Sequence, residues 1–231
     1  VFAGVGDALS LATAGNAATF ALQTRDRFGN RVGVDFSTPF AFQLRDSLRQ
    51  VLDLEAVAAK TSPDEWRVTL LSKTGAIAAY RGGVGALYIS GLGSPVQGSP
   101  FSLAIVPNVV SPPNSTAFGP GLLGGANLRT ITVWVVPRDY WGNPLSDVTG
   151  VDVYPLLKYP APDPTVVVST STLVSTFEYP KVWKLQYITR NEGTPSAYIR
   201  INFAHIQGSP FALRIIGSVD GPLVPAKSFA D

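Results

Sequence analysis

Four landmarks occur twice along the chain and in the same order, which predicts two copies of one structural unit. The landmarks are Arg25–Asn30 and Arg138–Asn143, Trp66 and Trp183, Tyr88 and Tyr198, and Gln97–Leu103 and Gln207–Leu213. The first pair shares the pattern Arg-Asp-x-aromatic-Gly-Asn, and the last pair shares Gln-Gly-Ser-Pro-Phe. A repeat of this kind restricts the chain to folds that can be joined in tandem.

The repeats define the predicted domain boundaries. One unit covers residues 1–106, a proline-rich linker covers 107–115, and a second unit covers 116–217. Prolines hold such a linker extended and semi-rigid. The tail Val224–Asp231 resembles the linker and the opening of the second unit, so we expect residues 218–231 to hold a further linker and the start of another repeat. Because the chain has no initiator Met and no leader-like segment, we expect it to be part of a longer array.

Hydrophobic residues alternate with a period of two, which predicts strands. The alternating sets are Phe36, Thr38, Phe40, Phe42 and Leu44; Phe20, Leu22 and Thr24; and Ile131, Val133 and Val135. The 22 Gly and 19 Pro residues interrupt the chain at short spacing and leave little room for helices. The helix-like stretch Ser47–Lys60 is predicted to be a strand with a turn. The fold class is therefore all-β, with two tandem immunoglobulin-like β-sandwiches.

The two duplicated motifs are predicted to be architectural. In the first, the Asp accepts backbone N–H groups in a turn, Gly and Asn supply positive φ angles, and the aromatic residue, Phe28 or Trp141, caps the end of the sandwich. In the second, Gly and Pro shape the entry to the last strand, and Phe fills the core. The structural motif residues are Asp26, Gly29, Asn30, Asp139, Gly142 and Asn143 for the turn, and Gly98, Pro100, Phe101, Gly208, Pro210 and Phe211 for the last strand.

These motifs resemble the filamin-type immunoglobulin repeat. That family opens with Gly-Pro-Gly-Leu and a later Gly, which match Gly119–Leu122 and Gly124; Ala3–Leu9 is a degraded version. The Asp-x-x-Gly-Asn turn and the Gly-Ser-Pro-Phe ending are present in both units. The usual Asp-Gly-Thr-Tyr is replaced by Asp64–Trp66 and Tyr179–Trp183, so the repeats are divergent.

The resemblance implies a non-enzymatic protein that acts as a spacer, a dimerisation module or a dock for partner peptides. Docking in the family adds a partner strand beside strand C, with side chains resting against strand D. Strand C is predicted at Phe36–Arg45 and Val151–Leu157, and strand D at Val51–Val57 and Thr165–Val174. Pro155 in the second strand C favours an edge position and weakens that edge as a dock, so unit one is the better dock.

The predicted partner-binding residues follow from this placement. They are Phe40, Ala41, Phe42, Gln43, Leu44, Val51, Leu52 and Trp134. Trp134 lies between Val133 and Val135 and should point away from the core. It either marks a partner surface or packs against the neighbouring unit or the linker. Arg25 and Arg138 are expected to form surface ion pairs rather than ligand contacts.

Composition excludes several classes of function. The formal net charge is only +2 and no run of Lys or Arg occurs, which argues against nucleic acid. Cysteine is absent and His205 is the single histidine, so we expect no catalytic residues, no small-molecule substrate, no metal and no cofactor. The linker contains no Asp or Glu that could bind calcium between the units. No run of 18 apolar residues occurs, so membrane attachment would need segments outside this chain.

Two function classes remain. The first is a cell-surface adhesion module, as in gamete-expressed plant and algal proteins with filamin-like ectodomains. The Asn114 sequon in the linker, an acceptor for an N-linked glycan, slightly favours this class. The second is an intracellular filamin-like scaffold or actin-crosslinker rod; a ubiquitin ligase of the tripartite-motif kind is a third possibility. The partner is another protein, either an adhesion receptor or a cytoskeletal protein, and homotypic binding stays open.

Overall fold

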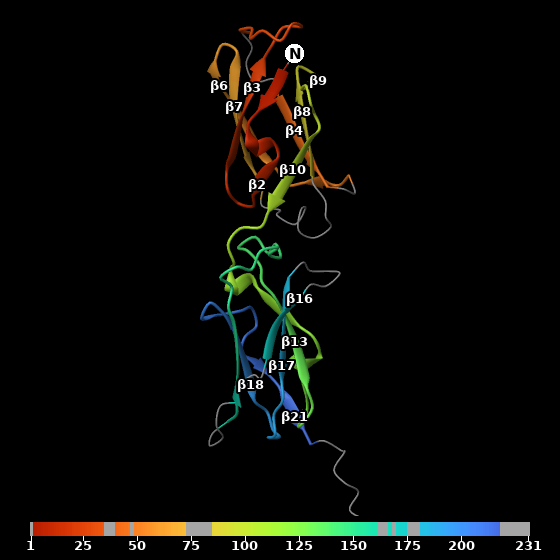
Figure 1. The fold of residues 1–231 in the computed structure, drawn as a ribbon, viewed down its shortest axis with the longest axis vertical. Helices are drawn as coiled ribbons and strands as arrows, with labels where there is room; N and C mark the ends of the chain where they lie inside the picture. Colours follow the sequence, from red (N-terminus) through yellow and green to blue (C-terminus); the bar gives the residue numbers. More distant parts are fainter. Residues whose placement is uncertain are drawn as a thin grey trace, which may run out of the picture. The chain divides into compact units, whose positions relative to one another are not determined.

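The computed structural model describes residues 2–34, 40–46, 49–72, 85–160, 166–167, 170–174 and 181–217. Contacts between Cα atoms divide the chain into two compact units. Unit 1 comprises Val1–Ser115, Val136–Thr149 and Ser175–Lys181, and unit 2 comprises Thr116–Val135, Gly150–Val174 and Val182–Asp231. Each unit holds one β-sandwich (Figure 1). The domain boundaries expected from the repeats remain a prediction.

The first sandwich consists of two mostly antiparallel sheets. One sheet has the order β1 (Phe2–Val5), β3 (Ala18–Thr24), β7 (Glu65–Leu71) and β6 (Glu55–Ser62). The other has the order β2 (Leu11–Thr13), β10 (Phe101–Val106), β8 (Gly85–Gly91), β4 (Phe40–Arg45) and β5 (Val51–Leu52), and β9 (Ser94–Pro95) also pairs with β8. A short 3-10 turn, η1 (Asp7–Leu9), joins β1 to β2.

The second sandwich repeats this plan. One sheet has the order β11 (Thr116–Phe118), β13 (Ile131–Val136), β17 (Val182–Tyr187) and β16 (Thr170–Val174). The other has the order β15 (Val166–Val167), β14 (Val153–Lys158), β18 (Ser196–Ile201) and β19 (Ala204–His205), with β20 (Phe211–Ala212) on β18. A separate parallel pair joins β12 (Gly124–Ala126) to β21 (Arg214–Ile216), and the turns η2 (Pro112–Asn114) and η3 (Pro120–Leu122) flank β11.

The predicted alternation produces the cores. In β3, Phe20 and Leu22 are 5% and 0% exposed, and in β13, Val133 and Val135 are 2% and 0% exposed. Trp66 on β7 is buried in the first core, where its ring lies 5.5 Å from that of Phe40. The all-β prediction is therefore confirmed. Phe36 and Thr38, which belong to the predicted first strand C, lie outside the described residues.

The predicted strand D is divided between the two sheets. In unit 1, β5 pairs with β4, whereas β6 pairs with β7 in the opposite sheet. In unit 2, β15 pairs with β14, and β16 pairs with β17. The prediction of one continuous strand in each unit was wrong, because the two parts of each predicted strand pair in opposite sheets. Thr165, Val168 and Ser169 of the second predicted strand D lie outside the described residues. The prediction that Ser47–Lys60 contains strand rather than helix is confirmed by β5 and β6.

The Arg-Asp-x-aromatic-Gly-Asn turns are built as expected around their carboxylates. Asp26 Oδ1 accepts the N–H groups of Phe28 and Asn30 at 2.8 and 3.0 Å, and Asp139 Oδ1 accepts those of Trp141 and Asn143 at 2.9 Å each. Gly29 and Gly142 have φ angles of 89° and 82°.

Two details of these turns differ from the prediction. Asn30 and Asn143 do not have positive φ; instead their side-chain amides donate to Asp26 and Asp139. Phe28 is 73% exposed and therefore does not cap the sandwich.

The guanidinium groups of the motif's arginines donate to carbonyls inside the turn, and the expected surface ion pairs stay a prediction. Arg25 donates to Gly29 O at 2.8 Å, and Arg138 donates to Gly142 O at 2.6 Å. Each guanidinium thus stabilises its own turn.

The serine of each Gly-Ser-Pro-Phe segment forms a hydrogen bond with a neighbouring strand of its sandwich. Ser99 Oγ accepts the N–H of Ile89 on β8, and Ser209 Oγ accepts that of Ile199 on β18, both at 2.9 Å. Phe101 packs against the first core, as predicted. Gly98 and Gly208 have φ angles of 87° and 79°, which glycine adopts without steric cost. The serine bonds were not foreseen, although the serine is identical in both copies.

Candidate functional site

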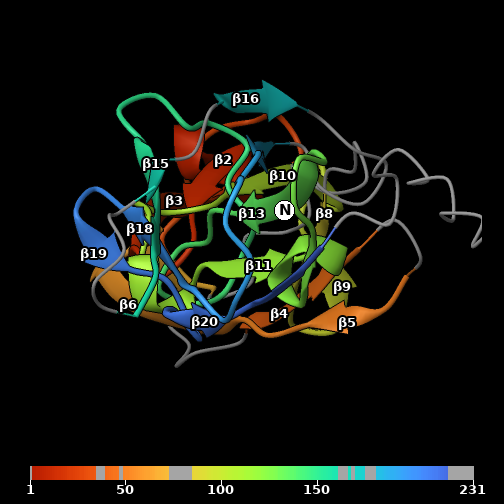
Figure 2. The same cartoon turned by 90° about the horizontal axis from the view of Figure 1, so that it is seen from below.

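The candidate site is the edge of β4, the outer strand of its sheet over most of its length (Figure 2). β4 pairs with β8 from Phe40 to Arg45, but β5 covers its other side only at Leu44 and Arg45. Within the described part of the chain, no strand pairs with Phe40–Gln43 on the side away from β8. An uncovered edge of this kind can accept an added strand.

The hydrogen bonds of β8 show which β4 groups are available. Phe42 lies opposite Ile89 in the ladder. The N–H of Ile89 donates to Ser99 Oγ, and its carbonyl accepts the N–H of Val96, so both groups point away from β4. In an antiparallel ladder this makes Phe42 and Ile89 a non-hydrogen-bonded pair. The N–H and C=O of Phe42 therefore face the uncovered edge.

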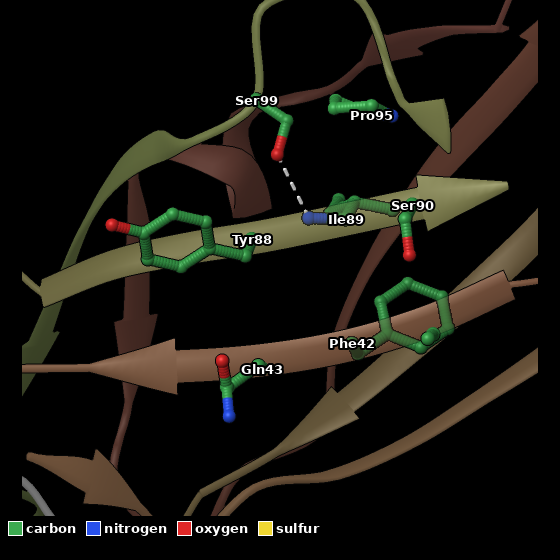
Figure 3. A pocket seen from close by; sticks show the side chains of 8 residues that line it. Phe42, Gln43, Tyr88, Ile89, Ser90, Pro95 and Ser99 are labelled. Atoms are coloured by element: carbon green, nitrogen blue, oxygen red, sulfur yellow. Dashed lines mark hydrogen bonds between the residues drawn. The ribbon is translucent and has the colours of Figure 1, made fainter. Parts of the chain in front are cut away.

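A hollow of about 450 Å³ lies over β4 and β8 on the outer face of this sheet (Figure 3). Its lining includes Ala41 and Gln43 from β4, Tyr88 and Ser90 from β8, and Pro95 from β9. We call it the β4–β8 hollow. The small side chains of Ala41, Ser90 and Pro95 leave the space, and Tyr88 forms one wall. Together, the edge and the hollow offer backbone hydrogen bonds and room for partner side chains.

One cation lies beside the hollow. Arg45 Nε donates to Gln43 Oε1 at 2.9 Å, and the guanidinium carbon of Arg45 lies 5.3 Å from the centre of the Tyr88 ring. The glutamine and the tyrosine thus hold the guanidinium on the outer face of the sheet. Arg45 and Gln43 make one end of the site cationic and polar, whereas Ala41 and Pro95 lie at the other end.

The structure brings most of the predicted partner-binding residues together, but in different orientations. Phe40, Phe42 and Leu44 point into the first core, and Leu44 is 0% exposed. Ala41 and Gln43 point outward to the hollow. On β5, Val51 is exposed and Leu52 packs against the core. The inward residues can therefore contribute their backbone groups to a partner, but not their side chains.

Trp134 belongs to unit 2, so it is not part of this site. It points away from the core, as expected for its place between Val133 and Val135. Its ring stacks on Phe118 of β11 at 6.3 Å, and Lys184 Nζ lies 5.7 Å from its centre. Trp134 thus packs against its own sandwich, and its role as a partner surface stays a prediction.

Asn114 occupies the last position of η2 in the linker. Its Nδ2 donates to Ser111 Oγ and to the carbonyl of Tyr140, both at 3.0 Å. A glycan on this nitrogen would replace one of the two donated hydrogens. Glycosylation of Asn114 stays a prediction.

Neither a metal centre nor a membrane helix was found in the part of the chain that the structure describes. No group of three His, Asp or Glu side chains there is placed to bind a metal ion. No helix there is long and apolar enough to cross a bilayer. His205 lies on the exposed hairpin strand β19, where it contacts Ser209 Oγ and Arg200.

Comparisons with known proteins agree on the fold. No protein-family model and no curated protein sequence matches the chain. Among solved structures, the Escherichia coli adhesin FdeC matches over 94% of this chain and 64% of its own, with a TM-score of 0.54 and 17% identity. Invasin, a bacterial integrin-binding protein, matches over 94% of this chain and 40% of its own, with a TM-score of 0.56 and 15% identity.

InvD of Yersinia pseudotuberculosis matches over 94% of this chain and 58% of its own, with a TM-score of 0.50 and 15% identity. The chain is built of tandem immunoglobulin-like sandwiches. It spans less than two thirds of each of these three structures. At such low identity the likeness establishes the fold alone.

Proposed function

We propose that this chain is a non-enzymatic protein-binding module of a cell-surface adhesion protein. The observation that carries the proposal is the uncovered edge of β4 beside the β4–β8 hollow. A partner strand added there would bond to the N–H and C=O of Phe42. Every second side chain of that strand would stand on the outer face beside Ala41 and Gln43, from where a long side chain can reach across Ala41 into the hollow and contact Tyr88.

Unit 2 offers a poorer dock. Pro155 lies opposite Ile199 in the ladder, as Phe42 lies opposite Ile89 in unit 1. Because proline has no N–H, the edge of β14 has one donor fewer than the edge of β4. In unit 2 the larger Tyr154 also stands at the place of Ala41, so its ring takes up the corresponding space. The first unit is therefore the proposed docking unit.

The adhesin and invasin likeness supports placement at the cell surface, where tandem sandwiches project a recognition face. An intracellular filamin-like scaffold remains the alternative, because strand addition would serve it equally well. The filamin-type resemblance and the gamete-expressed class rest on sequence motifs alone. A glycan on Asn114 is part of the surface proposal.

Peptide selection tests the dock without knowledge of the natural partner. Random 12-residue peptides displayed on phage are panned against the immobilised chain. Selected peptides should bind the Ala41→Tyr variant about tenfold more weakly, because tyrosine fills the hollow as Tyr154 does in unit 2. Val57→Tyr serves as the control, since Val57 is exposed on the opposite sheet. Failure to select any peptide, or equal binding by both variants, would overturn the proposal.

A further inference from the structure

A second surface, on unit 2, carries aromatic and cationic side chains. The outward positions of β14 hold Tyr154 and Lys158, those of β18 hold Tyr198 and Arg200, and the β18–β19 hairpin adds Phe203 and His205. β18 and β19 are adjacent strands of one sheet (Figure 2). We call these six residues the aromatic–basic face.

The rings and cations of this face are in contact. Tyr154 and Phe203 stack with their centres 5.0 Å apart, although Tyr154 is 40% and Phe203 77% exposed. Tyr198 lies 5.8 Å from His205, and Lys158 Nζ lies 5.2 Å from the Tyr198 ring. Arg200 Nε donates to His205 Nε2 at 3.2 Å. The rings therefore form a pre-arranged surface that needs little ordering on binding.

The turn of the hairpin indicates that Phe203 does not serve the fold. Asn202 and Phe203 have φ angles of 47° and 71°, and the equivalent Leu92 and Gly93 of unit 1 have 50° and 79°. Two-residue hairpin turns with both φ angles positive favour glycine at the second position. Unit 1 has that glycine, whereas unit 2 places an exposed phenylalanine in the same strained conformation.

The charge of the face is unbalanced. One carboxylate, that of Asp152, contacts the aromatic–basic face, where its Oδ2 accepts a hydrogen bond from the Tyr154 hydroxyl at 3.3 Å. Among the described residues, neither Lys158 nor Arg200 forms an ion pair. Two cations are thus available for an acidic partner. Unit 1 carries Ala41, Ser90, Gly93 and Pro95 where unit 2 carries Tyr154, Arg200, Phe203 and His205, so the sandwich does not require these side chains.

We propose that the aromatic–basic face binds an acidic segment of another protein. Carboxylates of that segment would pair with Lys158 and Arg200, and its apolar side chains would pack on Tyr154 and Phe203. Tyrosine, phenylalanine and arginine are the residues enriched at the centres of protein interfaces. The surface is distinct from the β4 edge and lies on the other unit. One chain could therefore hold two partners, or two segments of one partner.

Binding to defined probes tests this proposal on the whole chain. The probes are a peptide of alternating Glu and Leu, the same peptide with Lys in place of Glu, and heparin. The Glu peptide should bind, and binding should weaken with added salt. Arg200→Ser and Tyr154→Ala, which copy Ser90 and Ala41 of unit 1, should each weaken it about tenfold. Arg67→Ser, on the first sandwich, is the matched control.

Phe203→Gly separates binding from folding. It copies Gly93, so the variant should unfold at the same or a higher urea concentration, yet bind the Glu peptide about tenfold more weakly. A loss of stability in this variant would overturn the functional role of Phe203. Binding of heparin but not of the Glu peptide, equal binding of the Lys peptide, or no binding at all would overturn the proposal.

Discussion

Asp26 and Asp139 hold the same turn in the two repeats but differ in their surroundings. Asp26 is half-buried, and among the described residues its carboxylate bonds only within its own turn, whose residues 27–30 are exposed. Asp139 is 0% exposed, and its Oδ2 also accepts the backbone N–H of Asn108 at 3.0 Å. Asn108 belongs to the linker, and its side chain donates to the carbonyl of Ala14. Asp139 thus fastens the linker within unit 1 in addition to shaping the turn.

This difference predicts unequal effects of one substitution. Asp139→Ala leaves several buried donors without an acceptor and should lower the free energy of unfolding by about 1–3 kcal/mol. Asp26→Ala should lower it less, because water can replace the lost bonds of an exposed turn. Urea unfolding followed by tryptophan fluorescence measures both variants. Equal losses would contradict the role assigned to the linker contact.

The acid sensitivity of the fold follows from three carboxylates, one of which, Asp26, belongs to these turns. The side-chain amide of Asn30 is the main cause that lowers the pKa of Asp26, and the backbone N–H of Thr149 does the same for the pKa of Asp147. The hydroxyl of Ser62 lowers the pKa of Asp64. Carboxylates with a lowered folded-state pKa stabilise the fold above their unfolded pKa of about 3.9. That stability is lost as the pH falls through the folded value.

The Asp26→Asn variant tests this dependence, because asparagine keeps a side-chain oxygen but does not titrate. Its urea midpoint should fall less than that of the native chain between about pH 6 and about pH 3. The Val57→Tyr variant, which changes no titratable group, is the comparison. An unchanged pH dependence in Asp26→Asn would refute the contribution of this turn.

At the scale of elements, the sequence predicts strands well where side chains alternate. β3, β4 and β13 lie where the period of two placed them, because alternation depends only on one face being buried. The switch of strand D between sheets was not predictable in this way. The switch depends on the strands that β5 and β6 pair with, which are β4 and β7. The residue pattern of Val51–Ser62 does not indicate a change of partner. The direction in which the Phe42 N–H and C=O point was likewise not predictable, because it follows from the hydrogen bonds that Ile89 makes with Ser99 and Val96.

The edge of β4 gives a prediction for a matched pair of variants. Phe42→Ala and Phe42→Pro both lose the side chain that packs on the core, but only the proline lacks the N–H. A selected peptide should bind Phe42→Pro about twofold to tenfold more weakly than Phe42→Ala, the range expected for one hydrogen bond. Pro155 shows that the repeat tolerates proline there. Equal affinities would show that this N–H is not used.

At the scale of the whole molecule, the internal repeat was the most informative sequence signal. It identified two sandwiches and the turns that shape them, because turn residues act locally. The two candidate surfaces depend instead on how the repeats differ. Ala41 and Gly93 leave space or relieve strain in one unit, whereas Tyr154 and Phe203 fill the same positions in the other. These differences can be interpreted only after the two sandwiches have been aligned position by position.

Surface location is a property of the native protein and can be tested in its own cells. Antibodies raised against this chain should stain intact cells as strongly as permeabilised ones. An antibody against an abundant cytoplasmic protein controls for leakage. Staining only after permeabilisation would contradict the adhesion proposal and favour the intracellular scaffold.

Hydrogen exchange of the chain with and without a selected peptide tests strand addition at β4 most directly. An added strand should slow exchange of the Phe42 amide, which faces the uncovered edge. The corresponding segment of β14 should exchange at an unchanged rate, because Pro155 removes the equivalent donor. Protection at β4 alone is the result predicted here. Protection at β14 or elsewhere, with β4 unchanged, would contradict the proposed dock.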